Sequence, residues 1–359
     1  MMGCTPGQVS RGQALASNVP TGKVTVSDIA AETGVSVATV SKVLNGRADV
    51  AESTRERIQT ALDTHGYVKP PRAPSSPRKA KRPGLIDIVF TDPGSPWATE
   101  MIRGVEKASR DQRISVVVSV LDEEHSHDRW VDTIASRGSV GVILGSVLAD
   151  DAQRRIAELD VPTVMVDPMG DFASHVPSFG AGNWGGGLAA TEHLLELGHR
   201  RIGTITGPMR YLCSQARLAG YRAALERAGI TPDQQLIGQG DFHYDSAERA
   251  ASALLELDDP PTAIFAGNDE QALGVYAAAQ RHGLSVPDEL SVIGFDDVPM
   301  SQWVLPALTT VRAPIPELAR LAVRAILDRT EQADGPPVAR TELPTTLVVR
   351  SSTAAAPNR

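Results

Sequence analysis

The chain has 359 residues, more than one hydrophobic core usually holds, so we expect two or three domains. Hydrophobic residues make up 42% of it and charged residues 22%, and no apolar run approaches the roughly 18 residues of a membrane span. The N-terminus lacks the apolar core of a secretion signal, and two cysteines, Cys4 and Cys213, make no disulfide framework. These features argue against a membrane partner and indicate a globular protein of the cytoplasm.

The charge is distributed unevenly along the chain. The formal net charge is −8, yet residues 20–82 carry 11 basic and 6 acidic side chains, whereas residues 83–359 carry 23 basic and 37 acidic ones. A small basic head, with a net charge of +5, therefore precedes a large acidic body, with a net charge of −14. This asymmetry indicates a polyanionic partner for the head alone.

Two short helices are expected near the start of the chain. The first spans Val26–Thr33, with Ser27 as its N-cap, and the second spans Val37–Leu44, capped by Ser36. Gly34 supplies the left-handed residue that the turn between them needs. The side chains predicted to form the packed side are Ile29, Ala30, Val35, Val40, Val43 and Leu44.

Two short helices joined by a glycine-containing turn are typical of a helix-turn-helix, whose second helix enters the major groove of DNA. We therefore assign residues 23–69 to an all-α helix-turn-helix domain. The aperiodic Gly-, Ser- and Pro-rich extension before it, 1–22, is expected to be disordered. The pattern alone also fits any small three-helix bundle, but the basic charge favours DNA binding.

Residues 70–83, PPRAPSSPRKAKRP, hold five prolines, five bases and no acid, which predicts an extended linker. Beyond it, short β-branched runs alternate with helical stretches, as in parallel sheets covered by helices on both faces. The length of 84–350 favours two such α/β lobes, and 351–359 is expected to be a flexible tail. The predicted strands are Leu85–Phe90, Ile114–Val120, Gly141–Leu144, Thr163–Val166, Ile202–Ile205, Ala263–Phe265, Ser291–Phe295 and Leu347–Val349.

Several motifs are more specific than their periodicity. VTVSDIAAETGVSVATVSKVLNG in the head is followed in the body by GNWGGGLAATEHLLELGHRRIGTITGP, PTAIFAGNDEQALGVYAAAQRHGLSVPDELSVIGFDD and PALTTVRAPIPELARLAV. In these motifs, over roughly residues 23–350, the chain resembles the lactose-repressor (LacI/GalR) family. The resemblance implies a two-lobed body like that of periplasmic binding proteins. It also implies a repressor that binds a near-palindromic operator as a homodimer, under control of a small-molecule effector, a sugar or oligosaccharide rather than a nucleobase.

By this resemblance, the base-reading residues are Val37, Ala38 and Lys42. Val37 and Ala38 offer apolar contact that suits thymine methyl groups, and Lys42 can reach guanine O6 and N7. For Val37, a place in the core is the alternative. The residues placed to bond phosphates, which fixes register rather than sequence, are Ser36, Thr39, Ser41, Asn45 and Thr54.

The linker departs from the family pattern. Relatives usually follow the tyrosine matched by Tyr67 with a short hinge helix that inserts a leucine into the minor groove. Here Pro70, Pro71, Pro74 and Pro77 oppose a helix, and the stretch has no leucine. A leucine wedge is therefore not expected. The linker bases either follow DNA phosphates electrostatically or belong to a plain flexible tether.

In open α/β lobes, ligands bind beyond the carboxyl ends of the strands, where this chain has polar and aromatic residues. Planar side chains stack on sugar rings, while carboxylates, Arg and Asn bond hydroxyls. The effector contacts that the resemblance implies are Trp97, Asp167, Arg217, Phe242, Asn268 and Asp296. Trp184 and Trp303 are weaker candidates for the cleft lining. Taken singly, an aromatic residue such as Trp97 or Phe242 is more often a packing residue.

Other patterns are not assigned to chemistry. GAGNWG at 180–185 matches G-x-G-x-x-G, but the acid expected about 20 residues later is missing, so no dinucleotide cofactor is predicted. EEHSHD at 123–128 is interpreted as a solvated loop rather than a metal site. Asp296-Asp297 has no partner acid and base, so hydroxyl recognition and helix capping are its expected roles. We predict no cofactor, no metal and no enzymatic activity.

Two other classes of protein are the alternatives. A solute-binding protein of a transporter would share the fold of the body, but the helix-turn-helix head and the missing export signal disfavour it. A sugar-processing enzyme is disfavoured because the sequence has no G-x-S-x-G motif, P-loop or zinc-ligand set.

Overall fold

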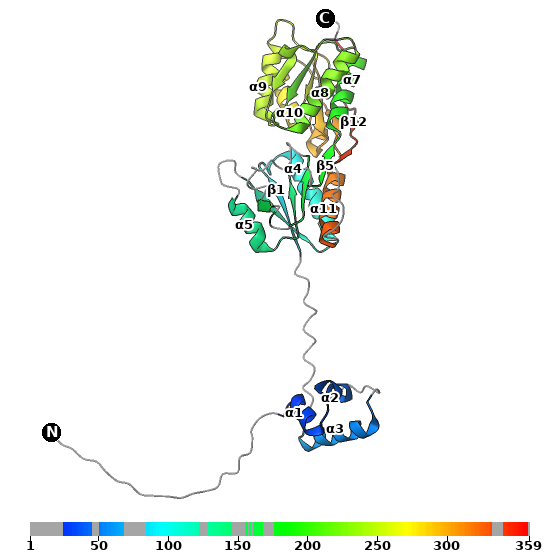
Figure 1. Ribbon diagram of the computed structural model, residues 1–359. Coiled ribbons are helices and arrows are strands. Elements are labelled where there is room, and N and C mark those ends of the chain that lie inside the picture. Colours follow the sequence, from blue (N-terminus) through cyan, green and yellow to red (C-terminus); the bar gives the residue numbers. More distant parts are fainter. Residues whose placement is uncertain are drawn as a thin grey trace, which may run out of the picture. The chain divides into compact units, whose positions relative to one another are not determined.

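The chain forms two compact units, Met1–Ala80 and Lys81–Arg359, called the head and the body below (Figure 1). The predicted extension 1–22 and linker 70–83 lie outside the part of the chain that the structure describes. This computed structural model describes residues 24–44, 50–67, 84–121, 128–145, 155, 156, 158, 161–167, 176–331 and 340–357.

The described part of the head contains three helices, α1 (Val26–Thr33), α2 (Val37–Leu44) and α3 (Glu52–Thr64). Gly34, between α1 and α2, has a φ of +65°, a left-handed conformation that glycine adopts without a steric penalty. The apolar sides of the helices meet in one core, which consists of Ile29, Ala30, Val40, Val43, Ile58, Ala61 and Leu62, with Val35 and Leu44 packed against it. The predicted packed side is therefore confirmed.

The first helix begins differently from the prediction. Thr25, not Ser27, is the N-cap of α1, because Thr25 and Asp28 form a reciprocal capping box. The Thr25 backbone N–H donates to the Asp28 carboxylate at 2.8 Å, and the Asp28 N–H donates back to the Thr25 hydroxyl. The second cap is as predicted: Ser36 Oγ accepts a hydrogen bond from the Thr39 N–H at 3.1 Å.

The body consists of two lobes, each built on a six-stranded sheet. Among the described strands every pairing is parallel except that of β10 with β12. Sheet A has the order β11 (Thr341–Leu343), β5 (Ser178–Ala181), β4 (Thr163–Val166), β3 (Gly141–Leu144), β1 (Leu85–Phe90), β2 (Ser115–Val120). Sheet B has the order β12 (Thr346–Val348), β10 (Thr309–Arg312), β9 (Ser291–Asp296), β8 (Ala263–Ala266), β6 (Ile202–Thr206), β7 (Ile237–Gln239).

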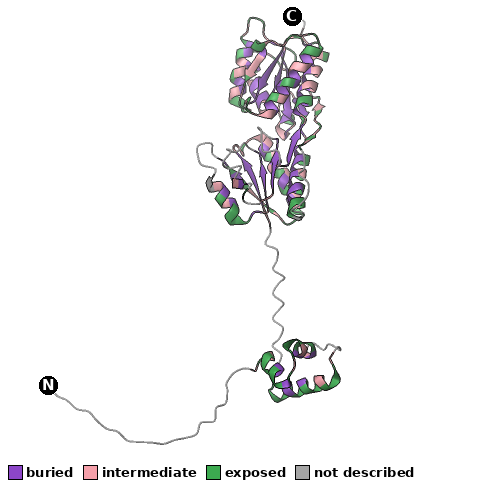
Figure 2. Cartoon of the chain, viewed as in Figure 1, coloured by how far each residue is buried: buried purple, intermediate pink, exposed green. Residues whose placement is uncertain are grey.

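Helices flank both sheets (Figure 1). Those of the sheet A lobe are α4 (Pro96–Arg110), α5 (Asp128–Arg137) and α11 (Ile315–Glu331). Those of the sheet B lobe are α7 (Asn183–Glu196), α8 (Leu212–Arg227), α9 (Tyr244–Leu255) and α10 (Asp269–Arg281), with the 3-10 turns η1 (Gln234–Leu236) and η2 (Pro299–Gln302). Buried residues concentrate on the strands and on the helix sides that face them (Figure 2). The predicted α/β lobes are therefore confirmed.

All eight predicted strands are present, with ends that differ by at most one residue from those expected. Four short strands, β5, β7, β10 and β11, were not predicted from the sequence. Among the described residues, no helix has the length and apolar character needed to cross a membrane.

Within the described residues the chain passes between the lobes three times, from β5 to α7, from β10 to α11 and from β11 to β12. Helix α11 packs against α4 and β4 of the sheet A lobe, although the strand before it belongs to sheet B. Strand β11 likewise returns to sheet A, where Thr341 pairs with Phe179 of β5. The two lobes are therefore joined by three separate connections.

The segment 351–357, which was expected to belong to a flexible tail, packs against sheet B instead. Ser352 is fully buried, and its Oγ donates to the Val292 carbonyl at 2.6 Å and accepts from the Thr309 N–H at 2.7 Å. Buried backbone groups need hydrogen-bond partners, and this segment supplies them to β9 and β10. Its small polar residues therefore serve packing rather than flexibility.

Candidate functional site

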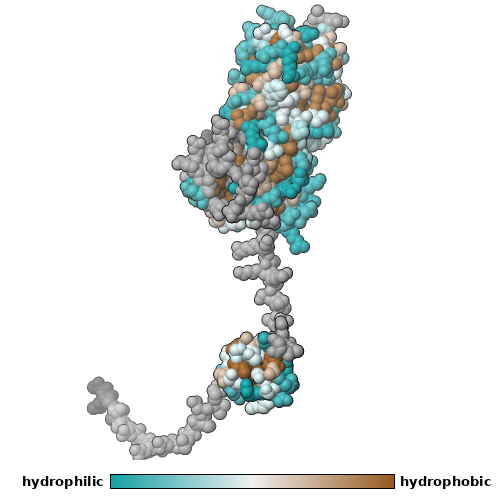
Figure 3. Space-filling model, turned by 45° about the vertical axis from the view of Figure 1, so that its right-hand side comes forward, coloured by the Kyte–Doolittle hydropathy of each residue, from teal (hydrophilic) through white to brown (hydrophobic). Residues whose placement is uncertain are grey.

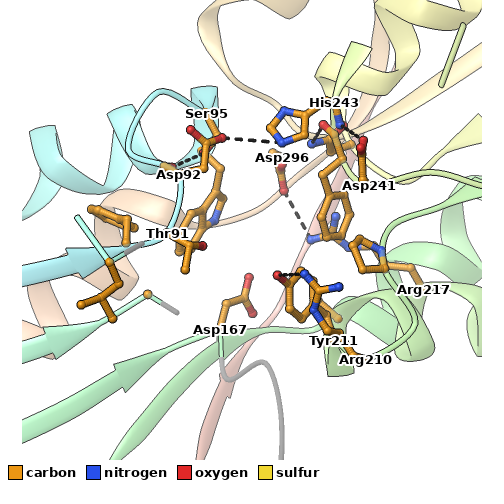
Figure 4. Close-up of a pocket in the computed structure, with 18 of the residues that line it drawn as sticks. Thr91, Asp92, Ser95, Asp167, Arg210, Tyr211, Arg217, Asp241, His243 and Asp296 are labelled. Carbon is orange, nitrogen blue, oxygen red and sulfur yellow. Dashed lines mark hydrogen bonds and ion pairs between the residues drawn. The ribbon is translucent and has the colours of Figure 1, made fainter. Parts of the chain in front are cut away.

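A cavity of about 720 Å³ lies between the two lobes, where the carboxyl ends of strands from both sheets meet (Figure 4). This volume falls within the range of roughly 300–1,000 Å³ that is typical of small-molecule sites. Residues at and after the carboxyl ends of β1, β2, β3 and β4 form one wall, and those of β6, β7, β8 and β9 form the other. All six residues assigned to effector binding line this cavity: Trp97, Asp167, Arg217, Phe242, Asn268 and Asp296.

Arg217, on α8, organises the floor of the cavity. Its buried side chain donates from Nε to Asn183 Oδ1 at 2.8 Å, from Nη1 to the Gly267 carbonyl, and from Nη2 to Asp296 Oδ1 at 3.4 Å. The face of the guanidinium lies on Phe295, with its carbon 3.7 Å from the ring centre. These contacts fix the guanidinium group in place, so its orientation does not depend on a ligand.

Two buried carboxyl groups share the floor with Arg217. Asp167 accepts hydrogen bonds from the Ala181 backbone N–H and from the Asn183 amide, both at 3.3 Å. Burial raises the pKa of Asp167 above its usual value, and Arg217 opposes that increase. Burial also raises the pKa of Asp296, to about 7, with Arg217 opposing the increase and Asp167 adding to it. The floor therefore has two carboxyl groups for one guanidinium charge.

Three of the six predicted residues have a left-handed backbone: φ is +49° at Asp167, +75° at Phe242 and +104° at Asp296. A non-glycine residue in such a conformation costs about 1–3 kcal/mol, and these positions concentrate in ligand sites. At Phe242 a glycine makes the arrangement possible, because a Cβ atom on Gly207 would lie 2.1 Å from the Phe242 ring. The local backbone is therefore shaped to place these side chains at the cavity.

Aromatic rings line both walls. Phe242 stacks with Tyr211 in the sheet B lobe, with ring centres 6.2 Å apart and planes 5° apart. Trp97 meets Phe90 edge to face in the sheet A lobe, with ring centres 6.1 Å apart. Tyr211 was not among the predicted site residues, although an aromatic residue directly after the β6 loop was an available signal. Other residues that line the cavity but were not assigned to effector contacts are Phe90, Thr91, Asp92, Ser95, Val120, Leu121, Gly145, Pro208, Arg210, Cys213, Asp241 and His243.

The two weaker tryptophan candidates lie outside the cavity. Trp184 is exposed on α7, where the Arg227 guanidinium carbon lies 5.9 Å from its ring centre, and Trp303 is 76% exposed. Asp297 is also outside the cavity, and its carboxylate pairs with Arg312 at 2.7 Å and with Arg350. The capping role expected of Asp297 is wrong, because η2 has no side-chain cap and two guanidinium groups hold this carboxylate instead.

The two remaining motifs have different outcomes. GAGNWG forms the end of β5 and the start of α7, where Asn183 bonds Arg217 and Asp167. Residues 122–127, which include most of the EEHSHD motif, lie outside the described part of the chain. Among the residues that are described, no group of three or more His, Cys, Asp or Glu side chains is arranged to hold a metal ion.

In the head, α2 has one buried and one exposed side. Val40 and Val43 face the core, whereas Val37 is 48% exposed and Ala38 and Lys42 are exposed as well. The alternative that Val37 is a core residue is therefore wrong. The three residues assigned to base contacts lie together on the open side of this helix. Figure 3 shows apolar side chains at the surface of the head.

The residues assigned to phosphates lie around the two helix starts. Ser36 is exposed and Thr39 is half-buried, and their hydroxyl groups hydrogen-bond to each other at 2.8 Å. Ser41 is exposed on α2, and Thr54 is half-buried in the first turn of α3. Asn45 lies outside the described residues.

Comparison with known proteins identifies both units. The family model described as "Bacterial regulatory proteins, lacI family" matches residues 25–69, and that of the "Periplasmic binding protein-like domain" matches residues 191–353. The HTH-type transcriptional repressor CytR of Escherichia coli K12 is 34% identical, over 86% of this chain and 90% of its own length. The chain belongs to the lacI family. The HTH-type transcriptional regulator MalR of Streptomyces coelicolor is 36% identical, over 92% of this chain and 97% of its own.

Solved structures of lacI-family regulators have the same architecture. The transcriptional regulator CelR in complex with cellobiose superposes with a TM-score of 0.70 at 32% identity, covering 92% of this chain and 99% of CelR. The lac repressor dimer bound to operator and the anti-inducer ONPF gives a TM-score of 0.68 at 27% identity, over 93% and 100% of the two chains. This lacI-family protein is therefore a DNA-binding transcriptional regulator and not an enzyme.

Proposed function

We propose that this protein is a repressor of the cytoplasm that binds a near-palindromic operator as a homodimer and responds to a carbohydrate bound between the lobes of its body. One observation carries the proposal. The same chain exposes Val37, Ala38 and Lys42 on the second helix of a helix-turn-helix and brings six predicted polar and aromatic residues into one cavity. The head binds the operator, and the cavity binds the effector that controls operator binding.

The exposed side of α2 suits direct reading of bases. Val37 and Ala38, in its first turn, contact thymine methyl groups, and Lys42, one turn later, donates to guanine O6 or N7. Ser36, Thr39, Ser41, Asn45 and Thr54 bond phosphates and set the register of the helix in the groove. The basic head supplies the attraction to DNA, so operator affinity falls steeply with salt.

The cavity suits a ligand rich in hydroxyl groups. Asp167, Asp296 and Arg217 offer acceptors and donors on the floor, and the Trp97 and Phe242 rings offer stacking faces on opposite walls. Asn268 positions the loop that carries Phe242, because its side-chain Nδ2 donates to the Phe242 carbonyl at 3.0 Å. Its Oδ1 accepts from the Gln271 backbone N–H, so Asn268 is also the N-cap of α10. The cellobiose of the CelR complex and the ribose bound to a regulator from Enterococcus faecium support a carbohydrate.

The two-lobed architecture offers a route from ligand to DNA. A ligand that contacts both walls favours one angle between the lobes, and the three connections let that angle change without unfolding either sheet. In a homodimer, such a change alters the spacing of the two recognition helices, which must match half-sites about one helical turn apart. Effector and operator affinity are therefore linked thermodynamically.

A second copy of this chain is the partner proposed for the exposed apolar residues at η2. Trp303 is 76% exposed and Leu305 is 91% exposed, on the same short stretch of the sheet B lobe. Apolar surface also gathers on this lobe in Figure 3. The lac repressor of the solved complex is a dimer, and a two-fold symmetric operator needs two heads.

An electrophoretic mobility shift assay with the DNA upstream of the protein's own gene tests the proposal. We expect a shifted band at low salt whose intensity changes when a binding saccharide is added. Absence of a shift with an unrelated DNA of equal length is the control for sequence specificity. A protein that binds its own upstream DNA no better than this control contradicts the proposal.

A further inference from the structure

The three connections between the lobes are short, and two of them are bonded to each other. The connection from β5 to α7 is Gly182 alone, that from β10 to α11 is 313–314, and that from β11 to β12 is 344–345. The Gly182 N–H donates to the Leu343 carbonyl at 2.8 Å, and the Thr345 hydroxyl donates to the Gly182 carbonyl at 3.3 Å. Any change in the angle between the lobes must be absorbed by these few residues.

The floor of the cavity is attached to two of these connections. The Ala313 N–H, in the connection from β10 to α11, donates to the Asp296 carbonyl at 3.2 Å. The N–H of Ala181, directly before Gly182, donates to the Asp167 carboxyl group at 3.3 Å. Asp167 follows β4 of sheet A and Asp296 ends β9 of sheet B, and both side chains line the cavity (Figure 4). The floor therefore lies on the residues about which the lobes can turn.

Asn183, the first residue of α7, joins floor groups of both lobes. Its Oδ1 accepts from Arg217 Nε at 2.8 Å, and its Nδ2 donates to Asp167 Oδ1 at 3.3 Å and to the Ala181 carbonyl at 3.0 Å. Arg217 belongs to the sheet B lobe and Asp167 to the sheet A lobe. These partners fix the orientation of the amide, because a guanidinium group only donates and a carbonyl only accepts.

The position of Asn183 points to a role in placing its neighbours. The side chain is buried and lies outside the described lining of the cavity, so it is not a ligand contact. It is not needed to cap its helix either, because the N-cap of α7 is Gly182. The hydrogen bonds of its amide are all made to the cavity floor and to the end of β5.

Loss of this amide leaves buried groups of both lobes short of a partner. Asp167 loses one of the two N–H donors described above, and Arg217 Nε loses its acceptor. A buried polar group without a partner is unfavourable, and water can satisfy these groups only if the floor opens. The amide of Asn183 therefore favours the arrangement in which the lobes are close at the floor.

We propose that Asn183 is a positioning residue that makes the hydrogen bonds of the cavity floor and the angle between the lobes change together. It holds Asp167 and Arg217 together across a connection of one residue. A ligand that replaces either hydrogen bond acts directly on this connection. The inference rests on the proposed function, because it concerns the cavity assigned to the effector.

Distances between spin labels on the two lobes test this proposal. The labels are placed on Lys107→Cys of α4 and Arg249→Cys of α9, both exposed positions, in full-length protein that carries Cys4→Ser and keeps the buried Cys213. Excess unlabelled protein ensures that a dimer carries at most one labelled chain. In pulsed electron spin resonance, without DNA or saccharide, we expect Asn183→Ala to widen the distance distribution at least twofold. An unchanged distribution overturns the proposal.

A second variant and a control separate this effect from a general loss of stability. Asn183→Asp keeps an acceptor for Arg217 but places a third carboxyl group beside Asp167, so it should widen the distribution at least as much, and it replaces the alanine variant if that does not fold. Gln271→Ala is the matched control, because the buried Gln271 donates to the Thr206 carbonyl at 3.1 Å within the sheet B lobe. Its loss should lower the unfolding temperature without widening the distribution. Equal widening in this control overturns the proposal.

A double substitution tests the link to the floor. Asp167→Ala should also widen the distribution, and Asp167→Ala combined with Asn183→Ala should widen it no further than the larger single effect, since both remove the same hydrogen bond. Additive widening contradicts the proposal. Because neither DNA nor saccharide is present, these outcomes leave the proposed function untouched. That function is contradicted separately, by wild-type protein that lacks specific operator binding in mobility shifts.

Discussion

His243 and Asp92 approach each other across the mouth of the cavity, with His243 Nε2 3.9 Å from Asp92 Oδ2 (Figure 4). Asp92 follows β1 in the sheet A lobe, and His243 precedes α9 in the sheet B lobe. The other ring nitrogen, Nδ1, lies 3.4 Å from Glu270 in its own lobe. The imidazole is therefore placed between acids of both lobes, and its contact with Asp92 exists only while the two loops are close.

Replacing this imidazole should weaken the arrangement in which the loops of Asp92 and His243 approach each other. Both side chains are nearly half exposed, and pairs of this kind contribute about 0.2–1 kcal/mol. We therefore expect His243→Gln to weaken saccharide binding by no more than about fivefold, as measured by calorimetry. His282→Gln, an exposed histidine at the end of α10, is the control. Loss of affinity well beyond tenfold indicates a direct contact with the ligand instead.

Lys42 should decide which DNA is bound. Lys42→Ala removes a donor to guanine, a contact worth about 1–3 kcal/mol of discrimination, so specific operator affinity should fall roughly tenfold to a hundredfold. Fluorescence anisotropy with operator and with scrambled DNA measures both affinities. Lys107→Ala, an exposed lysine on α4, should leave both unchanged. If Lys42→Ala weakens operator and scrambled DNA equally, the lysine contacts phosphate rather than a base.

Arg217 should be essential for the response of operator binding to saccharides but not for DNA binding itself. Arg217→Ala leaves two buried carboxyl groups without their cation, which costs about 3–5 kcal/mol of stability in comparable buried pairs. The variant should bind operator at permissive temperature and ignore saccharides in mobility shifts. Arg217→Lys keeps the charge, and should recover most of the stability but not the fixed geometry. Saccharide release that survives in Arg217→Ala shows that the ligand does not use the floor.

Asp296 should make stability depend on pH in an unusual direction. Its pKa is about 7 in the folded protein, against 3.8 normally, so the folded state retains a proton that the unfolded state has released. The contribution of Asp296 is therefore fully present below about pH 4 and is lost as pH rises from 4 to 7, by at most about 1.4 kcal/mol per pH unit. Thermal unfolding of wild type and Asp296→Asn at pH 5, 6, 7 and 8 measures this. The stability of Asp296→Asn relative to that of wild type should increase as the pH rises to 7. A stability difference that does not change with pH would contradict the raised pKa of Asp296.

The apolar residues at η2 should control assembly. Trp303→Ala combined with Leu305→Asp places a charge on the exposed surface and should convert a dimer into monomers in light scattering. Operator affinity should fall more than tenfold, because each half-site then binds one head independently. Trp184→Ala replaces an exposed tryptophan on α7 and should leave the dimer intact. A dimer that survives the double substitution rules out this surface as its interface.

The sequence predicted those parts of the fold that depend on local pattern. Runs such as that of β1 and β9 are β-branched and apolar, so their strands were found within one residue. Strands β5 and β7 were missed because SFGA and IGQ contain glycine and almost no β-branched residue, and only their neighbours in the sheets make them strands. The tail was misread for the same reason.

Some residues of the cavity could likewise be predicted from the sequence and others could not. Its polar residues after the strand ends were predictable, because parallel strands bring their carboxyl ends together. The partners of Arg217 were not, because Asn183 and Gly267 lie 34 and 50 positions from it in sequence and meet it only when the sheet B lobe has folded. The cap at Thr25 shows a smaller limit: a neighbouring Ser and Thr offer equal capping oxygens, and only the position of Asp28 separates them.

The three connections between the lobes have a consequence for synthesis of the chain. The sheet A lobe contains the first strand of the body, yet its helix α11 and its edge strand β11 come from residues 315–331 and 341–343, after nearly all of the sheet B lobe. On the ribosome, the sheet A lobe, which begins first, thus stays incomplete until most of the sheet B lobe has been made, and its apolar face remains uncovered during that time. An mRNA truncated after the codons of β10 therefore encodes a protein whose sheet B lobe is nearly complete and whose sheet A lobe lacks α11 and β11.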